Sequence, residues 1–157
     1  MTYRFRRLGS TGFSLVEMLI VVSMIGLMGL FSWPKVARIF DQRQVGSARL
    51  AVLNKFNQAR INARQSSRTA FLIRSGDVLW IERRPRVVPL PDGSTRDTVG
   101  GYLNLERTYG VTATVSSDTV QVDARGLTSP TRPWRIVLVR DGARDSILIS
   151  GFGRVTR

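Results

Sequence analysis

The residue types that carry most enzyme chemistry are scarce in this sequence. The 157-residue chain contains no histidine and no cysteine, which removes the commonest general base, the commonest metal ligand, disulfides and thiolate zinc sites. Its eleven acidic residues are scattered, with no D-x-D or E-x-x-E cluster. We therefore expect a protein that is not an enzyme, with no catalytic residue, no metal or other cofactor and no small-molecule substrate.

The sequence is strongly basic. All but two of its 24 basic residues are arginines, and the formal net charge is +13. A surface of this kind attracts polyanions, namely nucleic acid, anionic lipid or an acidic protein partner. Net charge alone identifies no specific ligand, since arginine also replaces lysine through genomic base composition. The positions of the arginines therefore matter more than their number.

A single carboxylate lies in an apolar segment near the N-terminus. Residues Phe13–Phe31 carry no charge except Glu17, although a carboxylate at mid-bilayer costs about 2.5–3.5 kcal/mol on insertion scales. At about 1.5 Å per residue, a helix of this length just crosses roughly 30 Å of hydrocarbon. Three arginines precede the segment, and such charges favour the cytoplasmic side. The pattern predicts a membrane-spanning helix over residues 13–33, with the N-terminus cytoplasmic and the rest of the chain outside.

The small residues of this region precede the apolar segment instead of following it. A secretory signal peptide carries a small-x-small cleavage site after its apolar run, whereas the residues that follow here are SWPKVARIF, without such a site. The small residues are Gly9–Gly12, GSTG. The sequence GFSLVE after a short basic leader resembles the class III signal of type IV prepilins and type II secretion pseudopilins.

This resemblance implies a processing site and a role for the carboxylate. In these families a membrane aspartyl peptidase cuts after the glycine, and the new terminal phenylalanine is methylated. The cut then falls between Gly12 and Phe13 and makes residues 1–12 a leader. Glu17 matches the acidic residue of these families. The resemblance implies that Glu17 pairs with the terminal amine of a neighbouring subunit in a filament, which neutralises two costly charges and sets the axial register.

The next segment predicts a second helical half. Pro34 follows the apolar run, and a proline within a helix removes one hydrogen bond and bends the axis. We expect a kink at Pro34 and an amphipathic helix over residues 34–67, since apolar side chains recur at spacings of three and four. This apolar stripe consists of Val45, Ala48, Val52, Phe56, Ala59 and Ala63. Arg60 and Arg64 lie off the stripe, one turn apart, where we expect a solvated face; DNA or an acidic neighbour is the alternative.

From residue 68 onward the apolar period changes to two, which predicts strands. The expected strands are Thr69–Arg74, Asp77–Arg83, Tyr102–Arg107, Val111–Val115, Thr119–Asp123, Arg135–Arg140 and Ser146–Ser150. Ser75-Gly76 and Asp141-Gly142 are expected turns. Residues 84–101, rich in proline and glycine, predict a loop with one short strand at most. Without βαβ alternation, residues 68–157 predict an antiparallel β domain packed on the long helix, an α+β fold.

Later segments resemble the GspH/FimT family of minor pseudopilins. LNKFNQARINARQSSRTAFLI is similar to the end of that family's helix and its first strand, VQVDARGLTSP to a strand and glycine turn, and RIVLVRDGARDSILISGFGRVTR to the terminal hairpin. The resemblance implies a pilin-like fold and a minor subunit of a type II secretion pseudopilus in the bacterial inner membrane, with a periplasmic β domain. The implied partners are other pseudopilins, the prepilin peptidase and secreted protein.

The C-terminus leaves a second function open. FimT-type minor pilins that bind DNA during natural transformation carry G-R-x-R near the C-terminus, whereas this chain has G-R-x-x-R, with Arg154 and Arg157. In an extended segment, a shift of one residue sends the second arginine to the other face. These arginines are therefore either DNA contacts or part of a frayed basic tail. Base stacking would support a single-strand site, but Trp80 and Trp134 lie in strand patterns that indicate the core.

Overall fold

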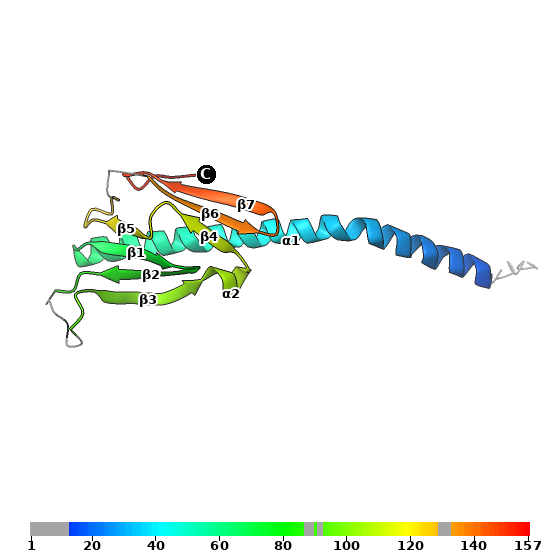
Figure 1. The fold of residues 1–157 in the computed structure, drawn as a ribbon, viewed down its shortest axis with the longest axis horizontal. Coiled ribbons are helices and arrows are strands. Elements are labelled where there is room, and N and C mark those ends of the chain that lie inside the picture. The colour runs from blue at the N-terminus through cyan, green and yellow to red at the C-terminus, as the bar shows by residue number, and fades with distance from the viewer. Residues whose placement is uncertain (1–12, 87–89, 91–92, 129–132) are drawn as a thin grey trace, which may run out of the picture. The chain divides into compact units, whose positions relative to one another are not determined.

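A computed structural model describes residues 13–86, 90, 93–128 and 133–157, except the side chains of residues 31 and 32. The chain divides into two compact units, residues 1–37 and 38–157. Helix α1 (Leu15–Ser66) runs through both, whereas every described strand belongs to the second unit (Figure 1). The predicted leader, including Gly12, lies outside the described residues.

Helix α1 is continuous from the apolar segment into the amphipathic one. Pro34 lies inside α1 and does not end it; the predicted kink at this proline stays a prediction. In the second unit, the predicted stripe is confirmed, because all six of its side chains are at most 2 % exposed. Spacings of three and four place them on one face of the helix, which packs into the core.

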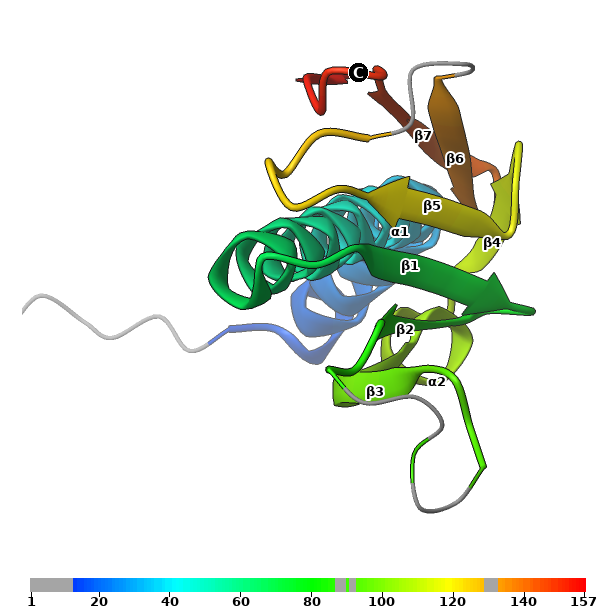
Figure 2. The ribbon, with the colours of Figure 1, turned by 90° about the vertical axis from the view of Figure 1, so that its left-hand side faces the viewer.

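In the described part of the chain, two antiparallel four-stranded sheets pack on this stripe. Their strand orders are β3-β2-β1-β5 and β4-β6-β7-β8. The strands are β1 (Ala70–Ser75), β2 (Val78–Arg83), β3 (Asp97–Asn104), β4 (Thr112–Val115), β5 (Thr119–Val122), β6 (Trp134–Arg140), β7 (Ala143–Ile149) and β8 (Val155–Thr156). Strands of both sheets lie alongside α1 and share one core with it (Figure 2). The predicted α+β class is confirmed.

Most predicted strands are confirmed, together with both predicted turns. Ser75-Gly76 lies between β1 and β2, and Asp141-Gly142 lies between β6 and β7. Positive φ angles at Gly76, Asp141 and Gly142 explain these residue choices, since glycine and aspartate tolerate the left-handed region. Strand β7 begins at Ala143 rather than at Ser146.

The segment after β2 differs from the prediction. The strand predicted over Tyr102–Arg107 is confirmed as far as Asn104, where β3 ends, and is wrong beyond it, because the short helix α2 (Leu105–Tyr109) follows. The side chain of Asn104 accepts a hydrogen bond from the N–H of Arg107, and Gly110, in the left-handed conformation, closes the helix. These are local capping signals, which outweigh the alternation of apolar residues.

Strand β3 begins at Asp97, within the segment predicted as a loop that could contain one short strand. It pairs with β2, and the register shifts between Leu79 and Ile81. In this interval β2 advances by two residues, from Leu79 to Ile81, whereas β3 advances by four, from Leu103 to Val99. Strand β3 thus carries two extra residues in a bulge that contains Gly100, with φ +77°. The bulge interrupts the period-two pattern, so the strand is longer than its sequence indicates.

Candidate functional site

The first half of α1 exposes an apolar surface on all sides. Its exposed large apolar residues are Leu15, Val16, Met18, Leu19, Ile20, Val21, Val22, Met24, Ile25, Leu27, Met28, Leu30, Trp33 and Val36. An 18-residue window of α1 has a mean hydropathy of 2.2, and none of it is buried. Its length and composition meet the requirements of a membrane span. Large exposed apolar surfaces mark sites of contact with membranes or other proteins.

Glu17 lies in the first turn of α1, directly after the start of this apolar surface. The helix dipole favours a negative charge at this position, because the first N–H groups of a helix have no partner within it. Among the described residues, no cationic group lies within ion-pair distance of Glu17. Phe13 precedes the helix and is exposed. The carboxylate is therefore available to a positive group from outside the described chain.

A second candidate site is a group of arginines from the end of α1 and from two turns of the β domain, which we call the basic end. Its described members are Arg60, Arg64, Arg125 and Arg154. The Nε atoms of Arg60 and Arg64 donate hydrogen bonds of 3.0 Å to the carbonyl oxygens of Gly126 and Arg125. The guanidinium of Arg60 also lies 5.8 Å from the centre of the Phe56 ring, a cation–π distance. Arg64 is exposed, as expected of a solvated face, whereas Arg60 is half-buried.

Two glycine turns allow this close approach of arginine to backbone. Gly126 has φ +79°, and a Cβ atom there would lie 2.4 Å from Nε of Arg64. Gly153 has φ +73°, and its Cβ would lie 3.5 Å from Cζ of Arg60, which brings the turn before Arg154 to the same place. Both turns thus favour glycine for conformation, and a Cβ at Gly126 would also displace the Arg64 guanidinium.

The sequence contains a local signal for the first of these turns. One oxygen of the Asp123 carboxylate accepts hydrogen bonds from the backbone N–H groups of Arg125 and Leu127. Such an Asp-centred turn followed by glycine is recognisable as D-x-x-G. Its contact with α1 is not recognisable, since the Arg60 side chain reaches a carbonyl 66 residues away.

The basic end has no acidic partner among the described residues. None of the guanidinium groups of its four arginines lies within 4.0 Å of a carboxylate in the described part of the chain. Arg157 differs, because its Nε donates a 3.1 Å hydrogen bond to Asp145. Arg154 and Arg157 flank β8 (Val155–Thr156), and residues three apart in an extended segment point to opposite faces. Arg154 and Arg157 therefore point to opposite faces of this segment, as the altered spacing predicts.

The two tryptophans of the β domain lie in different environments. Trp134 is buried in the core, as predicted. The same prediction for Trp80 is wrong: Trp80 is half-buried and lies on the opposite face of β2 from the buried Leu79 and Ile81. Its ring centre lies 5.9 Å from that of the exposed Tyr102. The reason is position in the strand, since alternate residues face opposite sides of a sheet.

Lys55 and the acidic residues offer little for catalysis. Burial lowers the pKa of the Lys55 amine, whose Nζ donates a 2.5 Å hydrogen bond to the carbonyl of Gly101. The described residues contain no group of three or more acidic side chains that could hold a metal ion. No nucleophile and base come together in the described hydrogen bonds.

The arrangement of one long helix against antiparallel sheets is that of the type IV pilins. Two crystal structures of the type IV minor pilin FimU from Pseudomonas aeruginosa are similar to this chain. One has a TM-score of 0.53 at 18 % identity and covers 71 % of this chain and 90 % of its own. The other has a TM-score of 0.49 at 16 % identity, with coverages of 80 % and 90 %. No protein-family model and no curated protein sequence matches the chain. At these identities the similarity shows the fold alone.

Proposed function

We propose that the chain is a minor pseudopilin, which assembles through the first half of α1 into an inner-membrane-based filament of a type II secretion system. The observation that carries this proposal is the exposed apolar surface of that half, with Glu17 in its first turn. Such a helix needs lipid around it before assembly and other helices afterwards. The pilin fold of the remaining chain supports the same function.

The assembly step depends on processing at the start of the helix. A prepilin peptidase removes residues 1–12 and frees the amine of Phe13, which is then methylated. In the filament, this amine pairs with the Glu17 carboxylate of a neighbouring subunit. Each charge is costly alone in an apolar environment, so the pair favours one axial register between subunits. The β domain then lies on the periplasmic side, where it contacts other pseudopilins or secreted protein.

Loss of the Glu17 charge tests the assembly step. Glu17→Gln should insert into the membrane at least as well as the parent, because it removes an intramembrane charge. Crosslinking to neighbouring pseudopilins should nevertheless fall by about tenfold or more, which corresponds to about 1.4 kcal/mol. Ser23→Ala is the matched control, since among the described residues the Ser23 hydroxyl donates only to the carbonyl of Leu19 in the same helix. Normal crosslinking of the Gln variant would rule out the amine–carboxylate pair.

Intact-mass measurement of the protein from cells tests the processing step. The mature chain should begin at a methylated Phe13. A Gly12 substitution that blocks the peptidase should leave residues 1–12 in place and keep the subunit out of the filament. Retention of the leader by the parent chain, in a host with an active prepilin peptidase, would contradict the proposal.

A second candidate function is DNA binding by a minor type IV pilin during natural transformation. The specific observation in its favour is the basic end, where four arginines have no acidic partner among the described residues. Arginine recruits phosphate through its charge and through paired hydrogen bonds. Arg154 belongs to this site, whereas the side chain of Arg157 is hydrogen-bonded to Asp145.

Salt-dependent binding of the full chain to a short duplex, in neutral detergent, separates the two functions. A dedicated site predicts large losses for Arg60→Gln and Arg154→Gln, with a salt slope lower by about one unit for each lost phosphate contact. Non-specific attraction predicts small and equal losses for these variants and for Arg96→Gln and Arg144→Gln. We expect equal losses. A sharp loss confined to the basic end would favour DNA uptake.

A further inference from the structure

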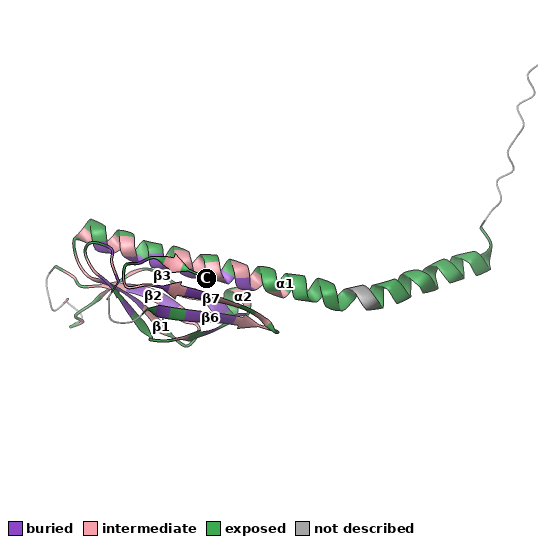
Figure 3. Cartoon of the chain, turned by 90° about the horizontal axis from the view of Figure 1, so that it is seen from above, coloured by how far each residue is buried: buried purple, intermediate pink, exposed green. Residues whose placement is uncertain are grey.

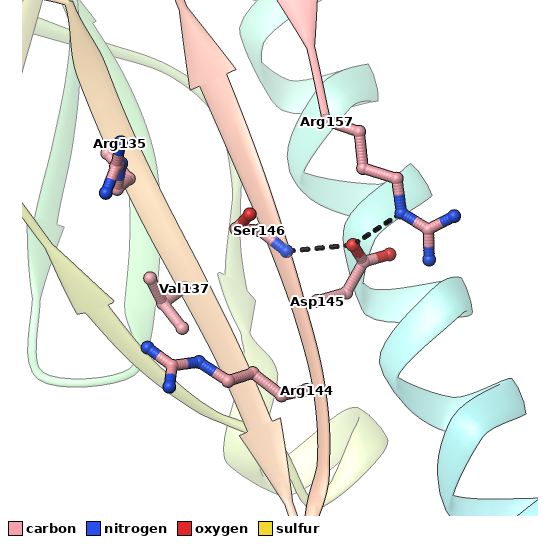
Figure 4. Close-up of a pocket in the computed structure, with 6 residues that line it drawn as sticks. All are labelled: Arg135, Val137, Arg144, Asp145, Ser146 and Arg157. Atoms are coloured by element: carbon pink, nitrogen blue, oxygen red, sulfur yellow. Dashed lines mark hydrogen bonds and ion pairs between the residues drawn. The ribbon is translucent and has the colours of Figure 1, made fainter.

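A hollow on the outer face of the second sheet has no part in either function. It has a volume of about 390 Å³ and is lined by Arg135, Val137, Arg144, Asp145, Ser146 and Arg157 (Figure 4). Strand β6 supplies the first two residues, β7 supplies the next three, and Arg157 follows β8. Three of these six lining residues are arginines, and Val137 is the apolar one.

The one carboxylate in the lining is already neutralised. Oδ1 of Asp145 accepts hydrogen bonds from Nε of Arg157 at 3.1 Å and from the N–H of Ser146 at 2.8 Å. Nε of Arg49, on α1, lies 3.8 Å from Oδ2. Two arginines therefore share one buried negative charge, and Asp145 leaves the other cations of the hollow unpaired.

Arg135 and Arg144 are these unpaired cations. Both are exposed, and neither side chain has a hydrogen bond or ion pair with any residue that the structure describes. Val137 lies between them on the outer face of β6, with the Arg144 side chain extending over the sheet toward it (Figure 4). The two guanidinium groups can each bind an anionic group, and Val137 between them can contact an apolar group. The arrangement therefore suits a ligand that carries two anionic groups with an apolar group between them.

The spacing of these groups matches an extended chain. Arg144 pairs across the sheet with Val139, and Ser146 pairs with Val137. Arg135 and Val137 lie two residues apart on β6, about 6.6 Å. The backbone of Arg144, on β7, lies beside Val139, two residues further along β6. We propose that the hollow binds an extended acidic segment of a partner protein, with carboxylates at positions i and i+4 opposite Arg135 and Arg144 and an apolar side chain at i+2 on Val137.

The lining favours a peptide over nucleic acid. A nucleic-acid strand carries a phosphate at every nucleotide, so it would place negative charge, and not apolar surface, over Val137 between the two arginines. A peptide of the proposed pattern places apolar surface on Val137 and its carboxylates at the guanidinium groups, where paired hydrogen bonds form. The hollow lies within residues 38–157, so its ligand can be tested whether or not the chain enters a filament.

A labelled peptide, acetyl-Thr-Glu-Thr-Val-Thr-Glu-Thr-amide, tests the inference by fluorescence anisotropy with the full chain in neutral detergent. It should bind about tenfold more tightly than the same residues in the order Thr-Thr-Val-Glu-Glu-Thr-Thr. Arg135→Gln and Arg144→Gln should each weaken binding about tenfold, as expected for loss of a charge-assisted pair. Arg107→Gln, an exposed arginine on α2, should change it less than about twofold.

The possible outcomes distinguish the alternatives. Equal affinities for the two peptides would overturn the inference, because binding would then follow charge and not spacing. Tighter binding of a short DNA duplex, with the same losses for Arg135→Gln and Arg144→Gln, would assign the hollow to nucleic acid instead. Unchanged thermal unfolding of these surface variants would show that a loss of affinity does not reflect a loss of fold.

Discussion

The two halves of α1 share one helical backbone but differ in what covers their apolar side chains. In the first half, large apolar residues are exposed all around the helix, whereas the second half buries a single stripe (Figure 3). The first half is apolar without a period, and the second is apolar at every third or fourth residue. A helix that is apolar all around needs lipid or several neighbours, whereas a striped helix needs one packed layer.

This difference shows how one element serves two purposes. The second half is covered by the chain's own strands, and it therefore stabilises the β domain. The first half has no such cover in its own unit, so its apolar surface is left for a membrane or for other subunits. Substitutions in the two halves should consequently affect different measurements, namely unfolding of the β domain and assembly.

The largest expected effect is the loss of a core side chain in the second half. Phe56 is fully buried in the stripe, so Phe56→Ala should lower the free energy of unfolding by about 3–5 kcal/mol through lost contacts and a cavity. Ile20→Ala, in the exposed first half, should change it by less than about 0.5 kcal/mol. Denaturant titration of the full chain in neutral detergent measures both. Similar losses for the two variants would remove the distinction between the halves.

A smaller effect is expected where the second half is held by charge. Nε of Arg140 on β6 donates a 2.9 Å hydrogen bond to Asp41 of α1, and its Nη1 donates to the carbonyl of Tyr109. Arg140→Met should cost about 2 kcal/mol, because it leaves a mostly buried carboxylate without its partner. The more exposed pair of Arg83 and Asp97 provides the control, and Arg83→Met should cost less than about 1 kcal/mol. Equal losses in the free energy of unfolding for the two variants would mean that burial does not strengthen the pair of Arg140 and Asp41.

The close approach at the basic end gives a third, smaller effect. Gly126→Ala places a Cβ at a positive φ and against the Arg64 side chain. The backbone strain should cost about 1–2 kcal/mol, and displacement of Arg64 should add to it. Gly76→Ala isolates the strain alone, since Gly76 also has positive φ but no atom within 4 Å of its Cβ position. The same denaturant titration compares the two. A smaller cost at Gly126 than at Gly76 would contradict a tightly packed turn.

The smallest effect is a dependence of stability on pH. Because burial lowers the pKa of Lys55, the unfolded chain binds more protons than the folded chain between that pKa and the ordinary value. The free energy of unfolding should therefore rise with pH through this window, which ends near about 10.5. Lys55→Met should remove the rise, whereas Lys35→Met, in the first half of α1, should retain it. Denaturant titrations at several pH values decide this, and a rise that persists in Lys55→Met would assign it to another group.

The elements that were predictable from sequence are those whose signals are local. The stripe from Val45 to Ala63 follows the helical period, and the apolar segment with Glu17 is visible without any structure. The turns at Ser75-Gly76 and Asp141-Gly142 depend on two residues each. In these cases neighbouring residues impose the backbone conformation, so a short window contains the cause.

Tertiary structure decided the features that depend on residues distant in sequence. The sequence could not show whether Trp80 lies on the buried or the exposed face of β2, because the packing of the sheet against α1 decides which face is buried. It could not show that Arg60 binds a carbonyl 66 residues away, or that Asp145 pairs with Arg157 and leaves Arg135 and Arg144 free. Periodicity determines which residues share a face, but a charged side chain is paired or unpaired according to which distant segment packs against it, and that depends on the whole fold.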